Sequence, residues 1–411
     1  MPEEPVPEQS VTRGLTRNVI LLSLVSLLTD ISSEMTLTFL PFFLANVLKQ
    51  RTAIIGIVEG VADSTASLSQ LFSGWLSDVA GKRKALAMLG YGLSAVTKPL
   101  LYFARTWGWV FAVRFADRLG KGIRTAPRDA LLAASTPEST RGFAFGIHRA
   151  ADTAGAVIGL SAVALVIYLS QGGAELLHRL AFQRLVVVAL VPGFLALAVL
   201  ALVSEKAPPR RTTAAPRLSL AGMDSRFKWF LVAVTLFTLG NSSDAFLLLR
   251  AQNLGMSVLQ VALLLVGFNA VYSGLSPVAG HWSDRVGRRR LILIGWTIYA
   301  ATYAGFAAAR SVWHVVALFG LYAMYYGAAQ GAARALVADL VPDERRGTAY
   351  GVYNTAVGIT ALPASIIAGV LWQGAGGWHG FGPHAPFVFG ALLAALAMVV
   401  LSLRVPPSRP T

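Results

Sequence analysis

The sequence predicts an all-α integral membrane protein, with twelve transmembrane helices in two pseudo-symmetric six-helix bundles. Three observations support this fold class. First, 55% of the 411 residues are hydrophobic and 13% are charged, whereas roughly a quarter of the residues in a soluble protein are charged. Second, apolar stretches of about 20 residues, long enough to cross a bilayer, recur along the chain. Third, motifs of the first half return in the second half at matching places.

Each predicted span is an apolar segment bounded by polar or basic residues. The twelve spans are expected at residues 18–46, 53–77, 84–104, 107–133, 142–169, 182–203, 227–250, 256–280, 289–309, 312–338, 347–372 and 384–404. The second, fourth and fifth segments carry enough charge to score poorly on hydropathy alone. They are retained because removing one of them would break the alternation of charge between successive loops.

Loops on one side of this arrangement are rich in arginine and lysine. They include GKRK after span 2 and DRVGRRR after span 8, whereas the opposite loops carry few basic residues. Because basic loops stay in the cytoplasm, both termini are expected there, in a bacterial-type inner membrane. This pattern explains the net charge of +15, so no nucleic-acid partner is expected. The chain has no cysteine, which excludes disulfides and thiolate metal sites.

Composition divides the chain into five segments. Residues 1–16 begin Pro-rich and acidic and predict a disordered cytoplasmic tail rather than a signal peptide. Residues 17–203 and 227–405 are the two six-helix bundles. Residues 204–226 hold two adjacent prolines and predict a cytoplasmic linker. Residues 406–411 are a short cytoplasmic tail.

Two motifs are repeated between the halves. GWLSDVAGKRK (74–84) returns as GHWSDRVGRRR (280–290), and TPESTRGFAFGIHR (136–149) returns as VPDERRGTAYGVYN (341–354). A repeat at about half the chain length indicates two copies of one six-helix unit. In transporters built this way, the substrate site lies between the repeats near the middle of the membrane.

The first of these motifs resembles the signature loop of the major facilitator superfamily. Its glycines permit a tight turn between two helices. The resemblance covers essentially the whole chain and implies a transporter, not an enzyme, that works by alternating access. It also implies that this loop latches the halves together when the site is open to the outside. We expect a monomer without a cofactor, driven by a proton gradient. The latch positions are Gly74, Asp78, Gly81, Lys82 and Arg83, and Gly280, Asp284, Gly287, Arg288 and Arg289.

Span 4 carries a stripe of five basic residues. A basic face toward lipid is too costly, so the stripe must face a cavity, a carboxylate or the cytoplasm. RLGKG (118–122) resembles the superfamily's span-4 pattern Arg-x-x-Gln-Gly, which is often linked to proton coupling, but Lys121 replaces the glutamine. Steps of three and four place the five residues on one helical face: Arg114, Arg118, Lys121, Arg124 and Arg128.

Span 5 holds glycines spaced as in antiporters of the superfamily. Gly146, Gly155 and Gly159 follow the pattern Gly-x8-Gly-x3-Gly, although Leu160 stands where the antiporter motif continues with proline. The match favours export over import. Small residues at this spacing also let two helices pack closely, which is the structural alternative.

Ionisable residues inside the spans are functional candidates, because a charge within the bilayer is costly. The first span contains Asp30 and Glu34 in the stretch TDISSEMT, and the repeat pairs Glu34 with Asp244. Asp30 has no counterpart. We predict a proton relay in the N-terminal half, with structural ion pairs as the alternative. The proton-coupling candidates are Asp30, Glu34, Asp63, Arg118, His148 and Asp152.

The C-terminal half has fewer charged residues and more aromatic and amide groups, and is expected to contact substrate. The substrate-cavity candidates are Glu34, Arg118, Lys121, Asp244, Arg250, Asn269, Tyr325, Tyr326, Gln330, Tyr353 and Asn354.

These patterns predict a secondary active transporter that exports a small organic compound in exchange for protons. No metal-binding His pair, nucleophile elbow or phosphate loop has a supporting context, so no enzyme and no metal site is expected. Two transport alternatives remain open. One is a carrier of an anionic metabolite, held by Arg118, Lys121 and Arg250. The other is a divalent cation exporter, with ligands from Asp30, Glu34, His148 and Asp152.

Overall fold

The computed structural model describes residues 15–137, 140–205, 220–342 and 345–405. Within these ranges, the side chains of Asp78, Ala80, residues 276–286 and residues 327–331 also lie outside the described part. The predicted tails, most of the predicted linker, and the predicted site residues Asp78, Gly280, Asp284 and Gln330 therefore fall outside what the structure describes.

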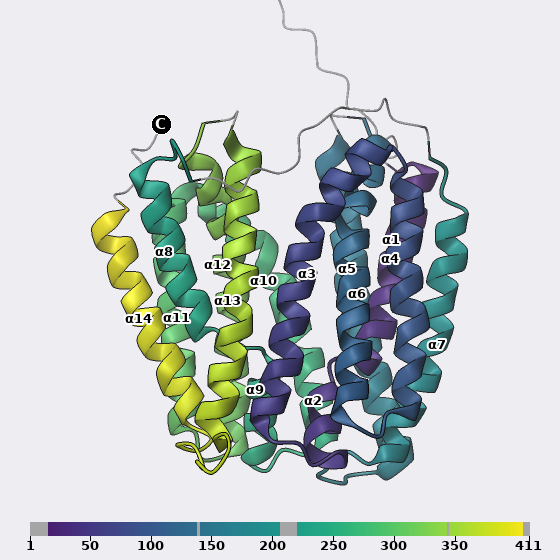
Figure 1. Cartoon of the computed structure of the whole chain (residues 1–411), viewed down its shortest axis with the longest axis vertical. Coiled ribbons are helices and arrows are strands. Elements are labelled where there is room, and N and C mark those ends of the chain that lie inside the picture. The colour runs from purple at the N-terminus through teal and green to yellow at the C-terminus, as the bar shows by residue number, and fades with distance from the viewer. Residues whose placement is uncertain (1–14, 138–139, 206–219, 343–344, 406–411) are drawn as a thin grey trace, which may run out of the picture.

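The described residues of the first half form six helical spans that lie side by side (Figure 1). The first span is broken, and a short 3-10 segment ends the third. In order, the elements are α1 (Arg17–Thr36), α2 (Leu40–Phe42) with the π-helical turn η2 (Phe43–Val47), α3 (Thr52–Ala80), α4 (Arg83–Thr97) with the 3-10 turn η3 (Lys98–Phe103), α5 (Trp107–Ala134), α6 (Arg141–Gln171) and α7 (Arg179–Ala201).

The described residues of the second half form six further spans, so the predicted count of twelve is confirmed. The seventh span is broken like the first. In order, the elements are α8 (Ser225–Gly240), α9 (Ala245–Asn253), α10 (Val258–Val286), α11 (Arg288–Ala308), α12 (Val312–Asp339), α13 (Arg346–Gln373) and α14 (Ala385–Arg404).

Eight spans in the described part of the chain are long and apolar enough to cross a membrane. The spans formed by α3, α4 and α5 fall short of that measure, and the described apolar part of α12, Val312–Tyr326, is shorter than the measure requires. The expectation of weak hydropathy was therefore right for spans 2 and 4, but wrong for span 5, because the long apolar part of α6 outweighs its charged start. The four weaker helices run alongside the others over the same height (Figure 1), so the bundle includes them.

The helix ends follow local chemistry. Ser257 and Gln260 form a capping box at the start of α10, in which each side chain accepts a hydrogen bond from the other residue's backbone N–H. α3 and α10 both end at a glycine with a positive φ, 61° at Gly81 and 90° at Gly287. These are the glycines of the repeated loop, and the left-handed turn that they allow is the reason for their place in the motif.

The seventh span breaks at a run of polar residues, Asn241–Asp244, whose side chains compete for backbone hydrogen bonds. The freed backbone groups find partners within the protein, as they must inside a membrane. The Tyr299 hydroxyl donates to the Gly240 carbonyl at 3.1 Å. The Ser243 N–H donates to Ser365 Oγ at 3.2 Å. The break places Asp244 immediately before α9.

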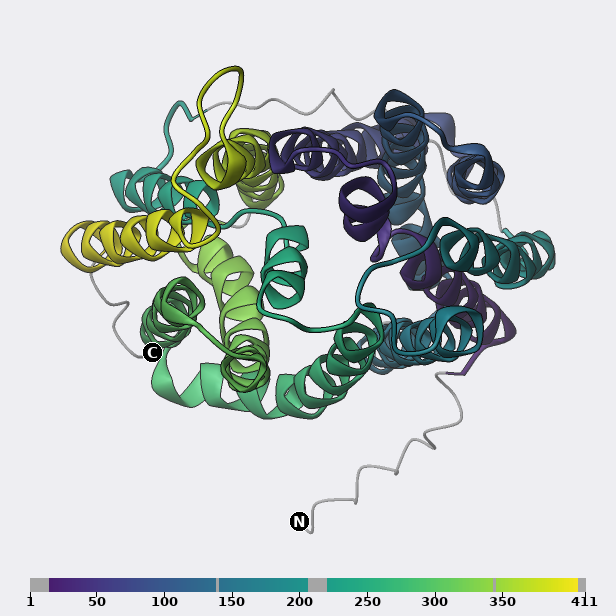
Figure 2. The same cartoon turned by 90° about the horizontal axis from the view of Figure 1, so that it is seen from below.

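The two halves meet mainly where α3 packs on α13 and where α6 packs on α10, as Figure 2 shows from below. Small residues let α3 and α13 approach closely. A Cβ added to Gly56 would lie 2.2 Å from the Ser365 carbonyl oxygen, so only glycine fits there. The Ser64 hydroxyl donates to the Gly358 carbonyl at 2.6 Å. We call this contact the α3–α13 seam.

The seam is tightest at the end of the bundle opposite to that where α1 begins and α14 ends. We call these the distal end and the termini end. At the distal end, Thr52 of α3 donates its hydroxyl to the Gly369 carbonyl and its N–H to Gln373 Oε1, both at 2.8 Å. The Glu175 carbonyl accepts the Val258 N–H across the other contact at 3.2 Å. Toward the termini end α3 and α13 diverge (Figure 1).

Several described residues of the two repeated loops contact groups that lie in or next to their own half of the chain. The Arg83 N–H donates to the Glu205 carboxylate at 2.7 Å. Arg288 forms an ion pair with Asp339, and Arg289 donates to a carbonyl of α14 at 2.9 Å. Gly74 lies against α5, and Gly81, Lys82 and Gly287 form the turns. The latch function of these positions stays a prediction.

Candidate functional site

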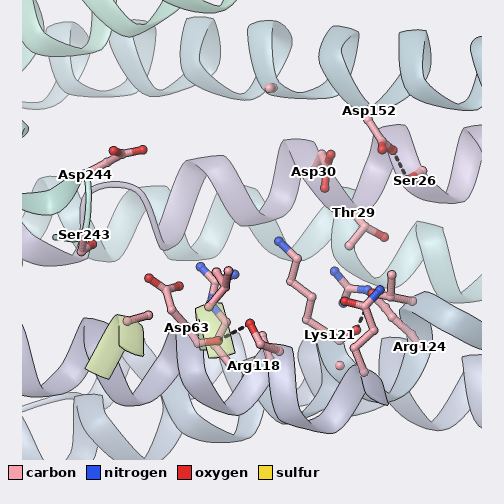
Figure 3. Close-up of a pocket in the computed structure, with 18 of the residues that line it drawn as sticks. Ser26, Thr29, Asp30, Asp63, Arg118, Lys121, Arg124, Asp152, Ser243 and Asp244 are labelled. Atoms are coloured by element: carbon pink, nitrogen blue, oxygen red, sulfur yellow. Dashed lines mark hydrogen bonds between the residues drawn. The ribbon is translucent and has the colours of Figure 1, made fainter. Parts of the chain in front are cut away.

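A polar cavity of about 710 Å³ lies between the two halves. Its walls come from α1, α3, α5 and α6 on one side, and from the α8–α9 break, α10, α12 and α13 on the other (Figure 3). Among the described residues that line it are five carboxylates and six basic side chains, so its two signs of charge nearly balance. We call it the central cavity.

Three arginines of the basic stripe on α5 bind protein groups. Arg114 forms an ion pair of 2.6 Å with Glu59, and both side chains are at most 5% exposed. Arg124 donates to Ser94 Oγ at 2.8 Å and lies 4.5 Å from the centre of the Tyr91 ring. Arg128 pairs with its neighbour Asp129 at 2.8 Å. These three groups have protein partners that a substrate would have to displace.

The other two members of the stripe, Arg118 and Lys121, project into the central cavity (Figure 3). Among the described residues, neither side chain donates a hydrogen bond or has a carboxylate oxygen within 4.0 Å. The Lys121 amine points toward Asp30 across the cavity (Figure 3). Arg118 Nε is buried without a hydrogen-bond partner in the described part of the chain. Two cations are therefore available to a negatively charged ligand.

Asp30 on α1 lines the central cavity and is half-buried. Within the described structure, no donor hydrogen-bonds its carboxylate and no cation lies within 4.0 Å of it. The backbone of α6 packs close to it at Gly155.

The predicted antiporter-type glycines account for this close packing. A Cβ on Gly155 would lie 2.6 Å from the Leu27 carbonyl oxygen and 3.1 Å from the Asp30 Cβ. A Cβ on Gly159 would lie 3.0 Å from the Glu34 Cβ. Gly146 meets nothing within 4 Å. Two of the three glycines thus let α6 pack directly against the two acids of α1.

Glu34 faces a second chamber of about 310 Å³ rather than the central cavity. The Thr38 hydroxyl donates to its carboxylate at 2.5 Å. This distal chamber adjoins the central cavity, because Asp63, Arg118, Ser243, Asp244 and Asn269 line both spaces.

Asp152 of α6 lines the central cavity nearer the termini end and is partnered. The Ser26 hydroxyl donates to one of its oxygens (Figure 3). His148 Nδ1 lies 3.8 Å from the other oxygen. The His148 ring is buried and does not line the pockets described here. Asp152 is therefore tied to α1, whereas Asp30 is not tied to α6.

Asp244 presents its carboxylate to the central cavity from the helix break of the second half. The Tyr322 hydroxyl donates to one oxygen at 2.7 Å and the Tyr326 hydroxyl donates to the other at 2.9 Å. No lysine or arginine among the described residues lies within 4.0 Å of it. Two neutral phenols orient this carboxylate and leave its charge uncompensated.

The remaining predicted cavity residues separate into three groups. Asn269 and Tyr326 line the central cavity. Tyr325, Tyr353 and Asn354 line a smaller neighbouring pocket of about 270 Å³. The prediction for Arg250 was wrong: its guanidinium is buried and donates to the carbonyls that end α11, at 3.2 Å from Phe306 O and 2.9 Å from Ala309 O. Arg250 is a helix cap rather than a substrate clamp.

Two cations in the bundle were missed from the sequence. Lys98 of η3 is 4% exposed, and its amine donates to Ser33 Oγ on α1 at 2.7 Å. Arg334 of α12 lines both the central cavity and the pocket beside it. Each is a lone basic residue inside a predicted span, and that alone marks a candidate, because such residues face the bundle interior or water.

The four ligands proposed for a divalent cation are not brought together. Within the described residues, no group of three or more His, Asp and Glu side chains is placed to hold a metal ion. Glu34 lies in the distal chamber, whereas Asp152 is bound to Ser26.

A family model described as the Major Facilitator Superfamily matches residues 22–249 and 218–411. The chain belongs to that superfamily. It is 35% identical over 397 residues to an uncharacterized MFS-type transporter of Methanocaldococcus jannaschii, covering 95% of each chain. It is 31% identical over 150 residues to the class E tetracycline resistance protein of Escherichia coli, covering 36% of this chain and 33% of that one. The solved POT family transporter PepTSo shares the fold, with a TM-score of 0.77 at 12% identity and coverage of 95% and 98%.

The resemblance drawn from the repeated loop is thus confirmed, and so is the fold class. This major facilitator chain is a multi-pass membrane transporter of small molecules, from a family whose members are not enzymes. In transporters built from two such repeats the substrate site lies between the halves, and the central cavity of this chain lies there.

Proposed function

We propose that this transporter exports a small organic compound in exchange for protons, with Asp30 as the carboxylate that takes up and releases the proton. This role is supported by the fact that the Asp30 carboxylate faces the cavity and has no bonding partner in the described structure. It lines the central cavity, and it has no hydrogen-bond donor or ion-pair partner among the described residues. Glu34 and Asp152, by contrast, each accept a hydroxyl hydrogen bond.

Lys121 supplies a physical link between the proton and the substrate. Its amine points toward Asp30 across the cavity (Figure 3). An ionised Asp30 attracts this amine and a protonated Asp30 does not, so the charge that Lys121 presents to a substrate depends on the protonation of Asp30.

Two further observations support export. At Gly155 and Gly159 α6 packs closely against the two acids of α1. Close packing of this kind is what the antiporter-type glycine pattern leads us to expect. Partial matches to proteins named for tetracycline resistance and for multidrug resistance, the latter from Bacillus subtilis, point the same way. We place both termini and the open end of the cavity in the cytoplasm, following the basic loops. Substrate would enter there and leave through the distal chamber.

An anionic metabolite is the second candidate cargo. Its support is the pair Arg118 and Lys121, which face the cavity without a carboxylate partner in the described structure. Arg250, whose guanidinium binds carbonyls at the end of α11, is not part of this anion site.

The test is proton movement driven by a compound gradient. The purified protein would be reconstituted into liposomes that contain a pH-sensitive dye, and small organic compounds, tetracycline among them, would be added one at a time. Asp30→Asn should abolish compound-driven proton movement while exchange of labelled compound across the membrane persists. Asp224→Asn, an exposed acid that caps α8 outside the spans, is the control. Proton movement that survives in Asp30→Asn would reject the assignment, and Glu34→Gln would then be tested in the same way.

A further inference from the structure

We infer that the cargo is a small zwitterion, with its anionic group between Arg118 and Lys121 and its cationic group at Asp244. The inference rests on the proposed transport function and adds the chemical class of the transported molecule.

The anion subsite is formed by two cations of α5 that have no carboxylate oxygen within 4.0 Å in the described part of the chain. Arg118 and Lys121 lie three residues apart, nearly one helical turn, so their like charges destabilise each other. Both line the central cavity. Arg118 Nε is buried without a partner in the described part of the chain. A carboxylate or phosphate between the two side chains would relieve the repulsion and accept charge-assisted hydrogen bonds.

The cation subsite lies on the opposite wall. Asp244 is exposed to the cavity, and each of its oxygens already accepts one hydroxyl, from Tyr322 at 2.7 Å and Tyr326 at 2.9 Å. A carboxylate oxygen has a second lone pair for another donor. The Phe268 ring lies 5.8 Å from the Tyr326 ring, so a third aromatic side chain lies next to the two phenols that hold the carboxylate. A carboxylate beside aromatic rings favours an organic ammonium, through ion pairing and cation–π attraction.

Both subsites have to be filled for the cavity to close without penalty. Closing removes water, and a buried charge without a counter-charge then costs several kcal/mol. A purely anionic cargo would leave Asp244 uncompensated, and a purely cationic one would leave Arg118 and Lys121 uncompensated. A zwitterion satisfies both subsites and preserves the near balance of five carboxylates and six basic groups on the described wall.

The placement of the two subsites also suits transport. Arg118 belongs to the first half and Asp244 to the second, so one bound molecule joins the halves. Both residues line the distal chamber as well as the central cavity. The cargo can therefore keep its contacts with both subsites when it is exposed to either side.

The experiment is a thermal unfolding series on the purified full chain at a single pH, without a membrane gradient. The zwitterionic probes are alanine, ω-aminobutanoate and ω-aminohexanoate. Each is matched by the fatty acid that lacks the amine and by the alkylamine that lacks the carboxylate. At saturating concentration, at least one zwitterion should raise the Tm by about 2 °C or more, and its two matched analogues should not.

Variants show which residue binds the amine of the probe and which binds its carboxylate. Asp244→Asn should remove the preference for the zwitterion over the fatty acid, and Arg118→Gln should remove the preference over the amine. Lys121→Gln replaces Arg118→Gln if that variant does not yield a monodisperse protein, and Asp224→Asn is the control. An amine or an acid that stabilises as well as its zwitterion would overturn the inference in favour of an organic cation or anion. No stabilisation of the wild type by any zwitterion would overturn it too.

This outcome is separate from that of the proposed proton coupling. The series measures binding at equilibrium, so it can succeed in a protein whose Asp30→Asn variant still moves protons. Proton exchange can equally be demonstrated for a cargo that fails this series.

Discussion

Gly56 on the α3–α13 seam should control which end of the transporter is open. A methyl group at this position, introduced by Gly56→Ala, would stand 2.2 Å from the Ser365 carbonyl oxygen and 2.9 Å from its carbon. Because both obstacles are backbone atoms, the two helices must separate by about 1 Å to restore a normal contact distance. Overpacking of this kind costs about 1–3 kcal/mol. The cost falls only on the state in which the distal end is closed, so the population should shift toward the opposite state about 5- to 150-fold.

This shift would be measured as the distance between two spin labels, determined by electron paramagnetic resonance. The chain has no cysteine, so paired labels attach only at introduced sites. A pair at Arg105 and Arg310, both exposed at the distal end, should report a longer distance in Gly56→Ala than in the parent. A pair at Lys82 and Arg290 at the termini end should report a shorter one. Gly92→Ala is the control, since a Cβ there meets nothing within 4 Å. Distances that do not change, or that change equally in the control, would refute the seam as the gate.

Two further substitutions test other contacts. Arg114→Gln leaves Glu59 buried without its cation and should lower the free energy of unfolding by about 3–5 kcal/mol, which would be measured as a lower Tm. Adding Glu59→Gln should recover much of this loss. A double variant as unstable as Arg114→Gln would contradict the role of the ion pair. Gly155→Ala places a methyl 2.6 Å from the Leu27 carbonyl oxygen and should cost about 1–3 kcal/mol in the same assay. Gly146→Ala should have no effect, and equal losses in the two variants would reject the packing explanation.

Spans, loops and repeats were predictable because they depend on local composition. The apolar lengths and the basic loops locate twelve spans, and the structure has helices at each of them. The match of ISSE to NSSD pairs Glu34 with Asp244, and in the structure both acids lie at breaks in their spans, Glu34 near the end of α1 and Asp244 just before α9. A polar run inside an apolar segment is a local signal that indicated the acids, whereas the breaks themselves were not predicted.

Partners of individual charges were not predictable, because they depend on the neighbouring helices. The spacing on α5 correctly placed five cations on one face, yet three of them bind protein groups and only Arg118 and Lys121 face the cavity unpaired in the described residues. Arg250 looked equally available in the sequence. The carbonyls that it caps lie at the end of α11, about 56 residues further along the chain. Because the partner is so distant in sequence, no local pattern could predict this contact.

The separation of charged and aromatic walls has a consequence for how such a transporter can diversify. Proton exchange is assigned to α1, α5 and α6, while the tyrosines that bind Asp244 belong to α12. The two halves that carry these helices meet mainly at the α3–α13 and α6–α10 contacts. Substitutions that reshape the aromatic wall need no repacking of the charged one. A hybrid of two relatives joined between α7 and α8 should therefore keep the proton exchange and the anion subsite of one parent and take the cation subsite around Asp244 from the other.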